Sequence, residues 1–287
     1  MNRFFFITFF FFFAITPQNL MARDNSDNTW SMTLTETDIS YGPHERNTLD
    51  IYAPRGLKAL KPVHVFIHGG GWHKGDKKRY DDMGHFYADH GVVFVAINYR
   101  LSPEVKHPKL AEDSAKAVKW VYDNISKYGG DNGKIVLSGH SAGAHLAALI
   151  AADPRYLNAH NLQPNFLKAV IPNDTASFDF TDPIKKGRWF VQPLIDETFG
   201  TDNAELVEAS PITHARTNKA LPRFVLFVTS ERPDAVAQTQ NFHGAIIASG
   251  GRSETHIIEG NSHREMAKGM FDANSAISKE ILKVLWD

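Results

Sequence analysis

A serine between two glycines joins an apolar run to a stretch of small residues, and this arrangement most limits how the chain can fold. The pentapeptide runs from Gly139 to Gly143 with Ser141 at its centre. The run before it predicts a strand, and the alanine-rich stretch after it predicts a helix. A tight turn between them forces the serine toward an unfavourable backbone conformation, and only glycine avoids a clash at the two flanking positions. The pattern predicts a nucleophile elbow that exposes the Ser141 hydroxyl at the end of the strand.

The context strengthens this interpretation, because a G-x-S-x-G pentapeptide alone is a weak signal. Upstream, the β-rich run 63–67 leads into one histidine, three glycines and a tryptophan at 68–72. Downstream, Asp234 and then His263 each follow another β-rich run. The order nucleophile, acid, histidine is that of the α/β-hydrolases.

Apolar runs alternate with helical patterns along most of the chain. Near-continuous apolar runs are typical of parallel strands covered on both faces. The earlier segments 30–34 and 48–52 alternate apolar and polar residues, which is typical of antiparallel strands with one wet face. We therefore predict an α/β chain with a mostly parallel central sheet, antiparallel N-terminal strands and helices on both faces. Parallel strands are expected at 63–67, 92–97, 135–137, 168–171 and 223–228, and helices at 110–125, 235–248 and 276–285.

The segment 178–215 interrupts the alternation. It is rich in Asp, Pro and Lys, yet it carries several large apolar side chains. Connections of this length are usually functional or form small elements of their own. We interpret the segment as a short helical cap over the active site, and the alternative is a surface excursion whose aromatic side chains pack on the sheet.

Composition limits the classes of partner. The chain has 287 residues, of which 43% are hydrophobic and 22% charged, and its net charge is −1. One catalytic domain is expected at 23–287. A net charge near zero gives no electrostatic attraction to nucleic acid or to an anionic membrane surface. The chain has no cysteine, so disulfides, a cysteine nucleophile and a thiolate metal site are excluded.

The first 22 residues have the three regions of a secretory signal peptide. A basic start is followed by an apolar core of Phe and Ile and by a small-residue end at Ala22. The apolar core is short for a membrane span. We predict cleavage after Ala22, export to the periplasm or medium, and no stable membrane insertion afterwards; an uncleaved anchor is the alternative.

The separated polar residues form a predicted triad. A serine hydroxyl needs a base within hydrogen-bond reach, and the base needs a carboxylate that fixes its tautomer. His263 is the predicted base, because its loop follows a strand and precedes the final helix. Asp234 is the predicted acid, because it lies at the far side of the turn after the run 223–228. Glu231 competes with it but is expected to be solvated or paired with Arg232.

Backbone amides are expected to hold the charge that develops on a substrate oxygen. The predicted donors of this oxyanion hole are the amides of Gly70, Gly71 and Ala142, the last at the start of the elbow helix. The alternative for the glycine run is a flexible turn or a phosphate loop, but no Gly-Lys-Ser/Thr ending follows. Trp72 and His140 are the predicted substrate-binding residues.

A metal site and a cofactor are not expected. The pairs His68/His73 and His140/His145 are spaced unlike common metal motifs, and no H-E-x-x-H is present. We expect His68 to form a hydrogen bond within its own loop.

With these residues in place, the chain resembles the α/β-hydrolase esterases and lipases. This group includes hormone-sensitive-lipase-like esterases, bacterial feruloyl and acetyl-xylan-type carboxylesterases, and kynurenine formamidases. The resemblance covers residue 41 to the C-terminus. Hormone-sensitive-lipase-like members carry Asp-Ser-Ala-Gly-Gly at the elbow, whereas the sequence at 140–144 is closer to the feruloyl-type esterases and the formamidases. The segments that carry the resemblance are 41–42, 49–54, 68–72, 98–103, 128–131 and 139–143.

The resemblance implies a serine carboxylesterase that acts on small or aromatic esters. Because formamidases are typically intracellular, the leader favours an exported esterase whose substrate is an acylated saccharide fragment or an aromatic ester. The alternatives are an aryl-formamide hydrolase and a non-catalytic binding protein with a hydrolase fold.

Overall fold

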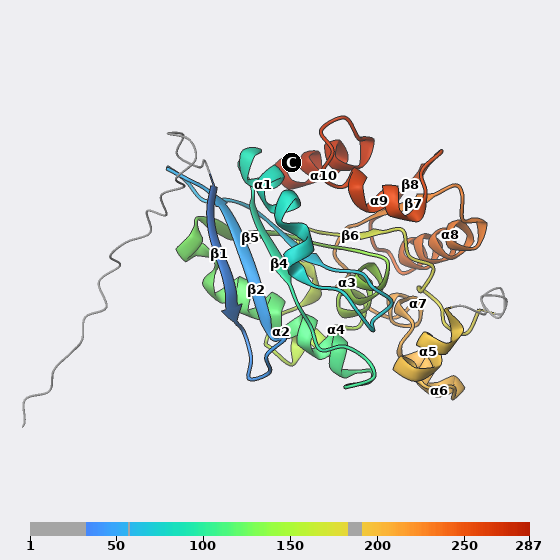
Figure 1. The fold of residues 1–287 in the computed structure, drawn as a ribbon. Coiled ribbons are helices and arrows are strands. Elements are labelled where there is room, and N and C mark those ends of the chain that lie inside the picture. The colour runs from blue at the N-terminus through green and yellow to red at the C-terminus, as the bar shows by residue number, and fades with distance from the viewer. Residues whose placement is uncertain (1–32, 57, 183–190) are drawn as a thin grey trace, which may run out of the picture. The chain divides into compact units, whose positions relative to one another are not determined.

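The computed structural model describes residues 33–56, 58–182 and 191–287, in which eight strands form one sheet (Figure 1). The strand order is β1-β2-β4-β3-β5-β6-β7-β8. β2 runs antiparallel to both β1 and β4, and all other neighbours are parallel. The predicted α/β architecture with antiparallel N-terminal strands is therefore confirmed. The strands are β1 (Thr33–Ser40), β2 (Thr48–Pro54), β3 (Lys61–Ile67), β4 (Val93–Ile97), β5 (Gly130–His140), β6 (Ala169–Asn173), β7 (Phe224–Thr229) and β8 (Ser253–Ile258).

Strand burial follows the apolar patterns. Every residue of β4, β6 and β7 is buried, as expected where helices cover both faces of a sheet. β1 is mostly half-buried or exposed, in keeping with its position at the edge of the sheet. β5 begins at Gly130, earlier than the apolar run alone indicates. Its polar first half is included because Gly130 pairs with Lys61 of β3.

Helices cover both faces of the sheet. α1, α9 and α10 pack on one face, and α2, α3 and α8 pack on the other; Figure 1 shows the first group above the sheet. The α-helices are α1 (Asp81–Asp89), α2 (Lys109–Asn124), α3 (Ala142–Ala152), α4 (Pro154–Asn158), α5 (Gln192–Phe199), α6 (Asn203–Glu208), α7 (Pro211–Ala215), α8 (Pro233–Ala248), α9 (His263–Gly269) and α10 (Ala276–Trp286), and the short 3₁₀ turns are η1 (Lys77–Tyr80), η2 (Ile125–Tyr128) and η3 (Pro164–Phe166).

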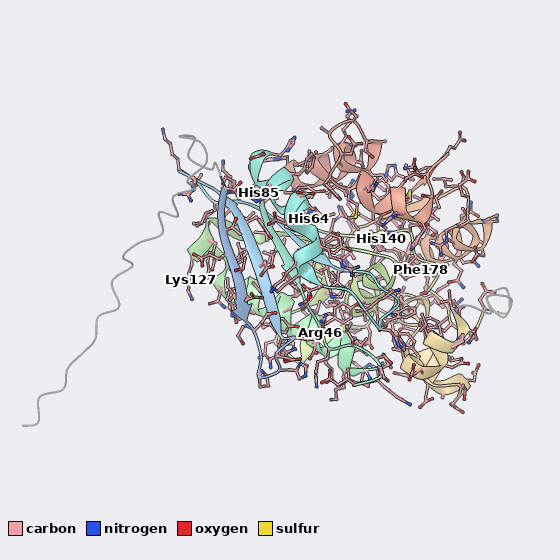
Figure 2. All side chains as sticks on the ribbon, viewed as in Figure 1. Arg46, His64, His85, Lys127, His140 and Phe178 are labelled. Atoms are coloured by element: carbon pink, nitrogen blue, oxygen red, sulfur yellow. The ribbon has the colours of Figure 1, made fainter. Side chains whose placement is uncertain are left out.

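The segment 178–215 contributes three helices, α5 to α7, in its described part. The aromatic side chains in its described part are buried: Phe178 stacks on Phe242 of α8 at 4.4 Å between ring centroids, and Phe180 packs against Phe199 at 4.6 Å. Figure 2 labels Phe178 beside α8. The segment thus adds to the core on the α8 side of the sheet while other residues in it reach the site described below.

Three buried histidines are expected to make stability depend on pH. Burial lowers the pKa of His64 to about 3, of His68 to about 4 and of His140 to about 3, from an ordinary value of 6.5. Below pH 6.5 the unfolded chain therefore binds protons that the folded protein excludes. Each such group lowers the free energy of unfolding by up to about 1.4 kcal/mol per pH unit between its two pKa values.

Urea unfolding at pH 7, 6 and 5 checks this expectation. The midpoint is expected to fall at each step. Carboxylates with lowered pKa values do not account for such a loss, because their contribution begins to disappear only below about pH 5. A midpoint that stays constant from pH 7 to pH 5 would contradict the neutral state of the three rings.

The predicted signal peptide at 1–22 and the first residues of the predicted strand at 30–34 lie outside the described residues. Within the described part of the chain, none of the helices has both the length and the apolar character needed to cross a membrane.

Candidate active site

Ser141 occupies a strained turn between β5 and α3. Its backbone has φ 58° and ψ −119°, in a region that residues with side chains rarely adopt. Its amide donates to the carbonyl of Asn173 at 3.0 Å, which fixes the turn to the neighbouring strand β6. This conformation is that of the predicted elbow.

The two glycines of the elbow are required by close backbone contacts. A Cβ on Gly139 would lie 2.4 Å from the carbonyl carbon of Gly143, and a Cβ on Gly143 would lie 2.0 Å from the carbonyl oxygen of Ile67. Both distances are far inside van der Waals contact. The elbow therefore packs directly against the end of β3, where the glycine run begins.

The glycine run lies beside the serine. A Cβ on Gly69 would approach the Cβ of Ser141 to 3.1 Å, and Gly70 and Gly71 have φ of 126° and 61°. The backbone of this loop closes on itself through hydrogen bonds to the carbonyl of Gly70. Among the described residues, the amides of Gly70, Gly71 and Ala142 have no hydrogen-bond acceptor. The three predicted donors are thus available to a ligand.

Polar contacts hold the glycine loop from behind. Arg46, labelled in Figure 2, donates to the carbonyl of Tyr99 at 2.8 Å and to that of Gly75 at 3.0 Å. The Tyr99 hydroxyl donates to the carbonyl of His68 at 3.1 Å, and the two rings stack at 4.5 Å. His68 Nδ1 also contacts the carbonyl of Gly69 at 2.8 Å, which confirms the hydrogen bond expected within its loop. These contacts preorganise the loop before a ligand arrives.

His263 opens helix α9 and faces the same cavity as the serine. Ser262 caps the helix, with Glu265 completing a capping box. The ring of His263 is directed at the carboxylate of Asp174, with its Nδ1 bonded to Oδ2. Ser141 and His263 line one cavity. Their side chains share no hydrogen bond in the described part of the chain, which is common in enzymes without substrate.

The carboxylate that orients His263 is Asp174, and the prediction of Asp234 for this position is wrong. Asp174 follows β6 directly and is completely buried. Asp234 is the second residue of α8 and lies in the wall of the cavity. β6 is the strand next to the serine strand β5, and Asn173 at its end donates to the main-chain carbonyl of Met266 in α9 at 2.8 Å. This contact brings the end of β6 beside the histidine helix.

Arg232 also contacts Asp174, which corrects its expected pairing with Glu231. Its Nη1 donates to the carboxylate at 2.9 Å and to the main-chain carbonyl of Asp174 at 3.1 Å. Burial alone raises the pKa of Asp174, but the hydrogen bond from His263 and the charge of Arg232 outweigh it. The net effect lowers this pKa below its usual 3.8. Asp174 is therefore an anion at neutral pH.

His140 lies behind His263 instead of in the cavity. Its Nε2 donates to the main-chain carbonyl of His263 at 2.9 Å, and the two rings are 4.4 Å apart. Because burial lowers the pKa of His140 to about 3, its ring is neutral at the pH of most assays. His140, predicted as a substrate-binding residue, is outside the set of residues that line the cavity; it supports the histidine loop.

Trp72 is one of the residues that line the cavity. The indole Nε1 donates to Nδ1 of His145 at 3.2 Å, and His145 Nε2 contacts the carbonyl of Ala209 at 2.8 Å. The indole is therefore held in place, and its contact with substrate stays a prediction.

The cavity that holds Ser141 has a volume of about 410 Å³. Its lining comes from α5, from the glycine run and elbow, and from the turns that follow β6 and β7. The apolar lining residues are Trp72, Ala142, Ala176, Val191, Leu194 and Pro233, and the polar ones include Thr175, Ser177, Glu231, Arg232 and Asp234.

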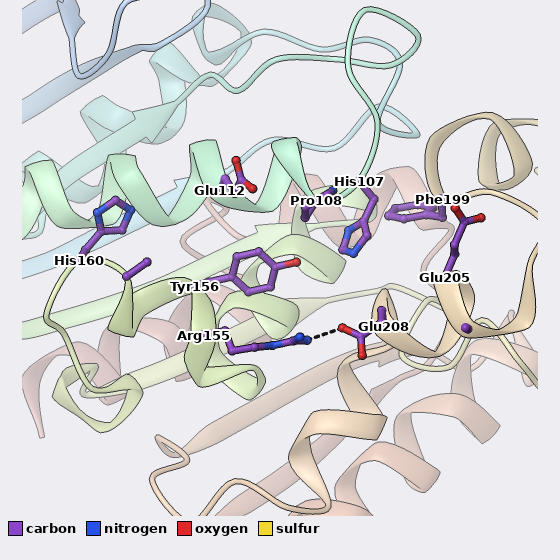
Figure 3. Close-up of a pocket in the computed structure, with 11 residues that line it drawn as sticks. His107, Pro108, Glu112, Arg155, Tyr156, His160, Phe199, Glu205 and Glu208 are labelled. Atoms are coloured by element: carbon purple, nitrogen blue, oxygen red, sulfur yellow. Dashed lines mark hydrogen bonds and ion pairs between the residues drawn. The ribbon is translucent and has the colours of Figure 1, made fainter.

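A second cavity, of about 650 Å³, is larger but lacks the serine (Figure 3). It lies between α2, α4 and α6, and an ion pair of 2.5 Å between Arg155 and Glu208 crosses its edge. Phe199 lines it and also packs edge-on against Trp72 at 5.0 Å. Size alone does not identify the reactive site, because Ser141, His263 and two of the predicted amide donors, those of Gly71 and Ala142, line the smaller cavity.

In the described ranges of the chain, two groups of side chains have the spacing of metal ligands. His140, Asp174 and His263 bring one ligand atom each within 4.8 Å of the others, but their facing nitrogens already take part in the hydrogen bonds described above. In the other group, Glu254 pairs with Arg223 and Glu280 pairs with Lys283. His68 and His145, each from a pair considered in the sequence, make contacts within the protein instead.

Comparison with known proteins finds similarity to esterases. Residues 49–245 match the model of the family described as BD-FAE. The probable carboxylic ester hydrolase LipM of Mycobacterium tuberculosis is 35% identical over 221 residues, which cover 71% of this chain and 50% of LipM. A probable isoprenylcysteine alpha-carbonyl methylesterase of Oryza sativa, ICMEL1, is 28% identical over 79% of this chain and 56% of its own length. The chain thus spans about half the length of these curated relatives.

A solved structure with similar backbone is the thermophilic esterase Est2 of Thermogutta terrifontis. The TM-score is 0.67 at 26% identity, and the match covers 87% of this chain and 89% of that one. The propionate-bound form of the same esterase matches with the same TM-score at 25% identity.

Proposed function

The chain belongs to the BD-FAE family, within the α/β-hydrolase esterases and lipases, and from this premise we propose that it is a serine carboxylesterase that hydrolyses small or aromatic esters. The observation that carries the proposal is the convergence, in one cavity, of a serine in the elbow conformation, a histidine bonded to a buried carboxylate, and the amides of Gly71 and Ala142, which have no acceptor in the described part of the chain. Each element of acyl transfer has a residue in place.

In the proposed reaction, Ser141 Oγ attacks the ester carbonyl while His263 Nε2 takes its proton. Asp174 accepts from His263 Nδ1, which keeps the other ring nitrogen unprotonated and stabilises the imidazolium that forms. His263 then returns the proton to the leaving alcohol. Water, activated by the same histidine, attacks the acyl-enzyme and releases the acid.

The tetrahedral oxyanion is held by the amides of Gly70, Gly71 and Ala142. Such donors stabilise the transition state by roughly 3 kcal/mol each. The amide of Ala142 is at the N-terminus of α3, where the helix dipole adds a partial positive charge. No cofactor takes part in the proposed reaction.

The cavity supports a short acyl group beside a more polar alcohol. A volume of about 410 Å³ is at the lower end of the range for ligand sites. Trp72 and Leu194 give the acyl side its apolar surface, and Thr175 and Ser177 give the other side hydroxyl groups. We propose that the alcohol is part of a saccharide or an aromatic ring.

The test is labelling and turnover with purified protein. A fluorophosphonate probe is expected to modify Ser141, and peptide mass spectrometry identifies the modified residue. The turnover panel contains p-nitrophenyl acetate, methyl ferulate, an acetylated xylo-oligosaccharide and N-formylkynurenine. Faster hydrolysis of the formamide than of every ester would replace the proposal by the aryl-formamide hydrolase. Absence of both labelling and turnover would leave a non-catalytic binding protein.

Leu194 is expected to limit acyl length. Its Cδ1 lies 3.0 Å from the position that a Cβ on Gly71 would occupy, so the Leu194 side chain closes the cavity against the glycine loop. Leu194→Ala is expected to raise kcat/KM for p-nitrophenyl octanoate relative to the acetate by about tenfold, because one apolar group in a pocket changes discrimination by that order.

A series of p-nitrophenyl esters from acetate to decanoate measures the change. The matched control is Leu60→Ala, which removes an exposed leucine and is expected to leave the preference unchanged. An unaltered ratio in Leu194→Ala would show that another wall limits the acyl group.

We also propose export directed by residues 1–22, a proposal supported by the sequence pattern of that segment alone. Fractionation of cells that express the full chain, with N-terminal sequencing of the product, tests it. Product in the cytoplasmic fraction that still begins at Met1 would refute export.

A further inference from the structure

Arg232 forms a bridge between the carboxylate and the histidine of the site. Its side chain is 22% exposed, whereas Asp174 is completely buried. Nη1 lies 2.9 Å from Oδ2 of Asp174, 3.1 Å from the main-chain carbonyl of Asp174 and 2.9 Å from Nδ1 of His263. One guanidinium nitrogen thus contacts both partners of the histidine pair.

The donors and acceptors decide how these three groups are bonded. An imidazole nitrogen that faces a carboxylate carries the proton, so His263 Nδ1 is a donor to Asp174. The guanidinium of Arg232 has only donors, so it cannot form a hydrogen bond with that N–H. It donates to Asp174 instead. Two donors therefore converge on Oδ2, and one of them is a permanent cation in contact with the imidazole.

Arg232 also secures the backbone conformation of Asp174. Asp174 has φ 52°, in the left-handed region that residues with side chains rarely occupy. Its amide donates to the main-chain carbonyl of Phe227 at 2.8 Å, and its carbonyl accepts from the guanidinium of Arg232. The guanidinium therefore holds the carbonyl and the carboxylate of the same residue, which orients that carboxylate toward His263.

The charged and titratable groups around His263 come from several elements. Asp174 follows β6, and the neutral ring of His140 ends β5. Glu231 and Asp234 line the same cavity from the turn and helix after β7. On α9 itself, Arg264 is exposed and the carboxylate of Glu265 is used in the capping box. Among the residues that the structure describes, Arg232 is the cation in direct contact with the imidazole.

We propose that Arg232 is a positioning residue that holds Asp174 against His263 and that its charge, by opposing the imidazolium, sets the lower pH limit of activity. The inference rests on the proposed function. A cation next to a group that must become positively charged disfavours the charged form. The charge of Arg232 therefore extends hydrolysis further into acid.

The experiment compares pH profiles of kcat/KM for p-nitrophenyl acetate, from pH 4 to 9, in wild type and three variants. Arg232→Gln keeps a donor without the charge, Arg232→Lys keeps the charge with altered donor geometry, and Arg264→Gln removes an exposed charge from the adjacent position. In Arg232→Gln the acid limb is expected to move up by about one pH unit. In Arg232→Lys the limb is expected to stay within about 0.3 unit of wild type while kcat falls.

The outcomes separate this inference from the proposed function. The serine mechanism is established independently if the wild-type protein hydrolyses p-nitrophenyl acetate and the Ser141→Ala variant is no longer labelled by the fluorophosphonate. If the mechanism holds and the limb of Arg232→Gln coincides with that of wild type, the charge role is overturned. Equal displacement in Arg264→Gln would also overturn it, because the effect would then be general. Should Arg232→Gln not fold, as judged by thermal unfolding, a shift of one unit in Arg232→Lys would overturn the inference on its own.

Discussion

Replacement of Ser141 by alanine is expected to lower kcat for p-nitrophenyl acetate by about a millionfold, the order seen when a nucleophile of a serine triad is removed. The loss follows because the hydroxyl is the group that forms the acyl-enzyme, and the remaining amides stabilise only the attack of water. Steady-state hydrolysis and fluorophosphonate labelling measure it. The alanine needs the strained φ of 58° as well, so thermal unfolding accompanies the kinetics.

The control for this variant is Ser177→Ala, which removes another hydroxyl from the wall of the same cavity. It is expected to change kcat/KM by less than about tenfold, because one uncharged hydrogen bond contributes about 1 kcal/mol. A folded Ser141→Ala protein with wild-type turnover would refute the serine mechanism.

The second large effect is expected from Asp174→Asn, which should reduce kcat by about 10³ to 10⁴ at neutral pH. An amide in place of the carboxylate favours the wrong tautomer of the histidine and leaves the imidazolium without its counter-charge. The comparison variant is Asp234→Asn, which changes the same chemical group in the cavity wall and is expected to alter kcat by less than about tenfold.

Kinetics of both variants decide which carboxylate acts on His263. Removal of Asp174 leaves Arg232 without the anion that it contacts, so the stability of the variant is measured alongside. If Asp234→Asn lost more activity than Asp174→Asn, Asp234 would be the carboxylate that orients His263 during turnover. The contact between His263 and Asp174 would then belong only to the protein without substrate.

The sheet could be predicted from local patterns because its strands are buried on both faces. The runs 92–97 and 224–228 are apolar throughout, and they form most of β4 and β7, of which every residue is buried. Helix α1 was missed because Asp81–Asp89 contains charged residues and Gly84, which weaken its apolar pattern. Its burial against β2 and β4 stabilises it, and this depends on the whole sheet.

The site was predictable where one residue's role follows from local geometry. Ser141 was found because the turn itself requires glycines nearby, and His263 was found because it follows a strand. The acid was missed because Asp174 and Asp234 each follow a strand, and the spatial order of strands decides which of them reaches the imidazole. One signal was present: Asp174 follows the strand next to the serine strand, and adjacent parallel strands end at the same edge of a sheet.

The contact of Arg232 with Asp174 had no sequence signal, because a charged neighbour in the same turn was the simpler partner. Long side chains reach across several residues, and their pairing depends on which carboxylate is buried nearby. Electrostatic pairs of this kind become visible only in coordinates.

The indole of Trp72 is bonded to His145, and that imidazole is bonded in turn to the main chain at Ala209. A ring from the oxyanion loop is thereby fastened through the elbow helix to the connection that leads into α7. A chimaera that exchanges residues 178–215 with those of another member of the family keeps Ser141, Asp174 and His263 but loses this link unless the incoming backbone offers a carbonyl at the same place. Without that carbonyl, the chimaera is expected to hold its glycine loop less firmly and to have a lower kcat.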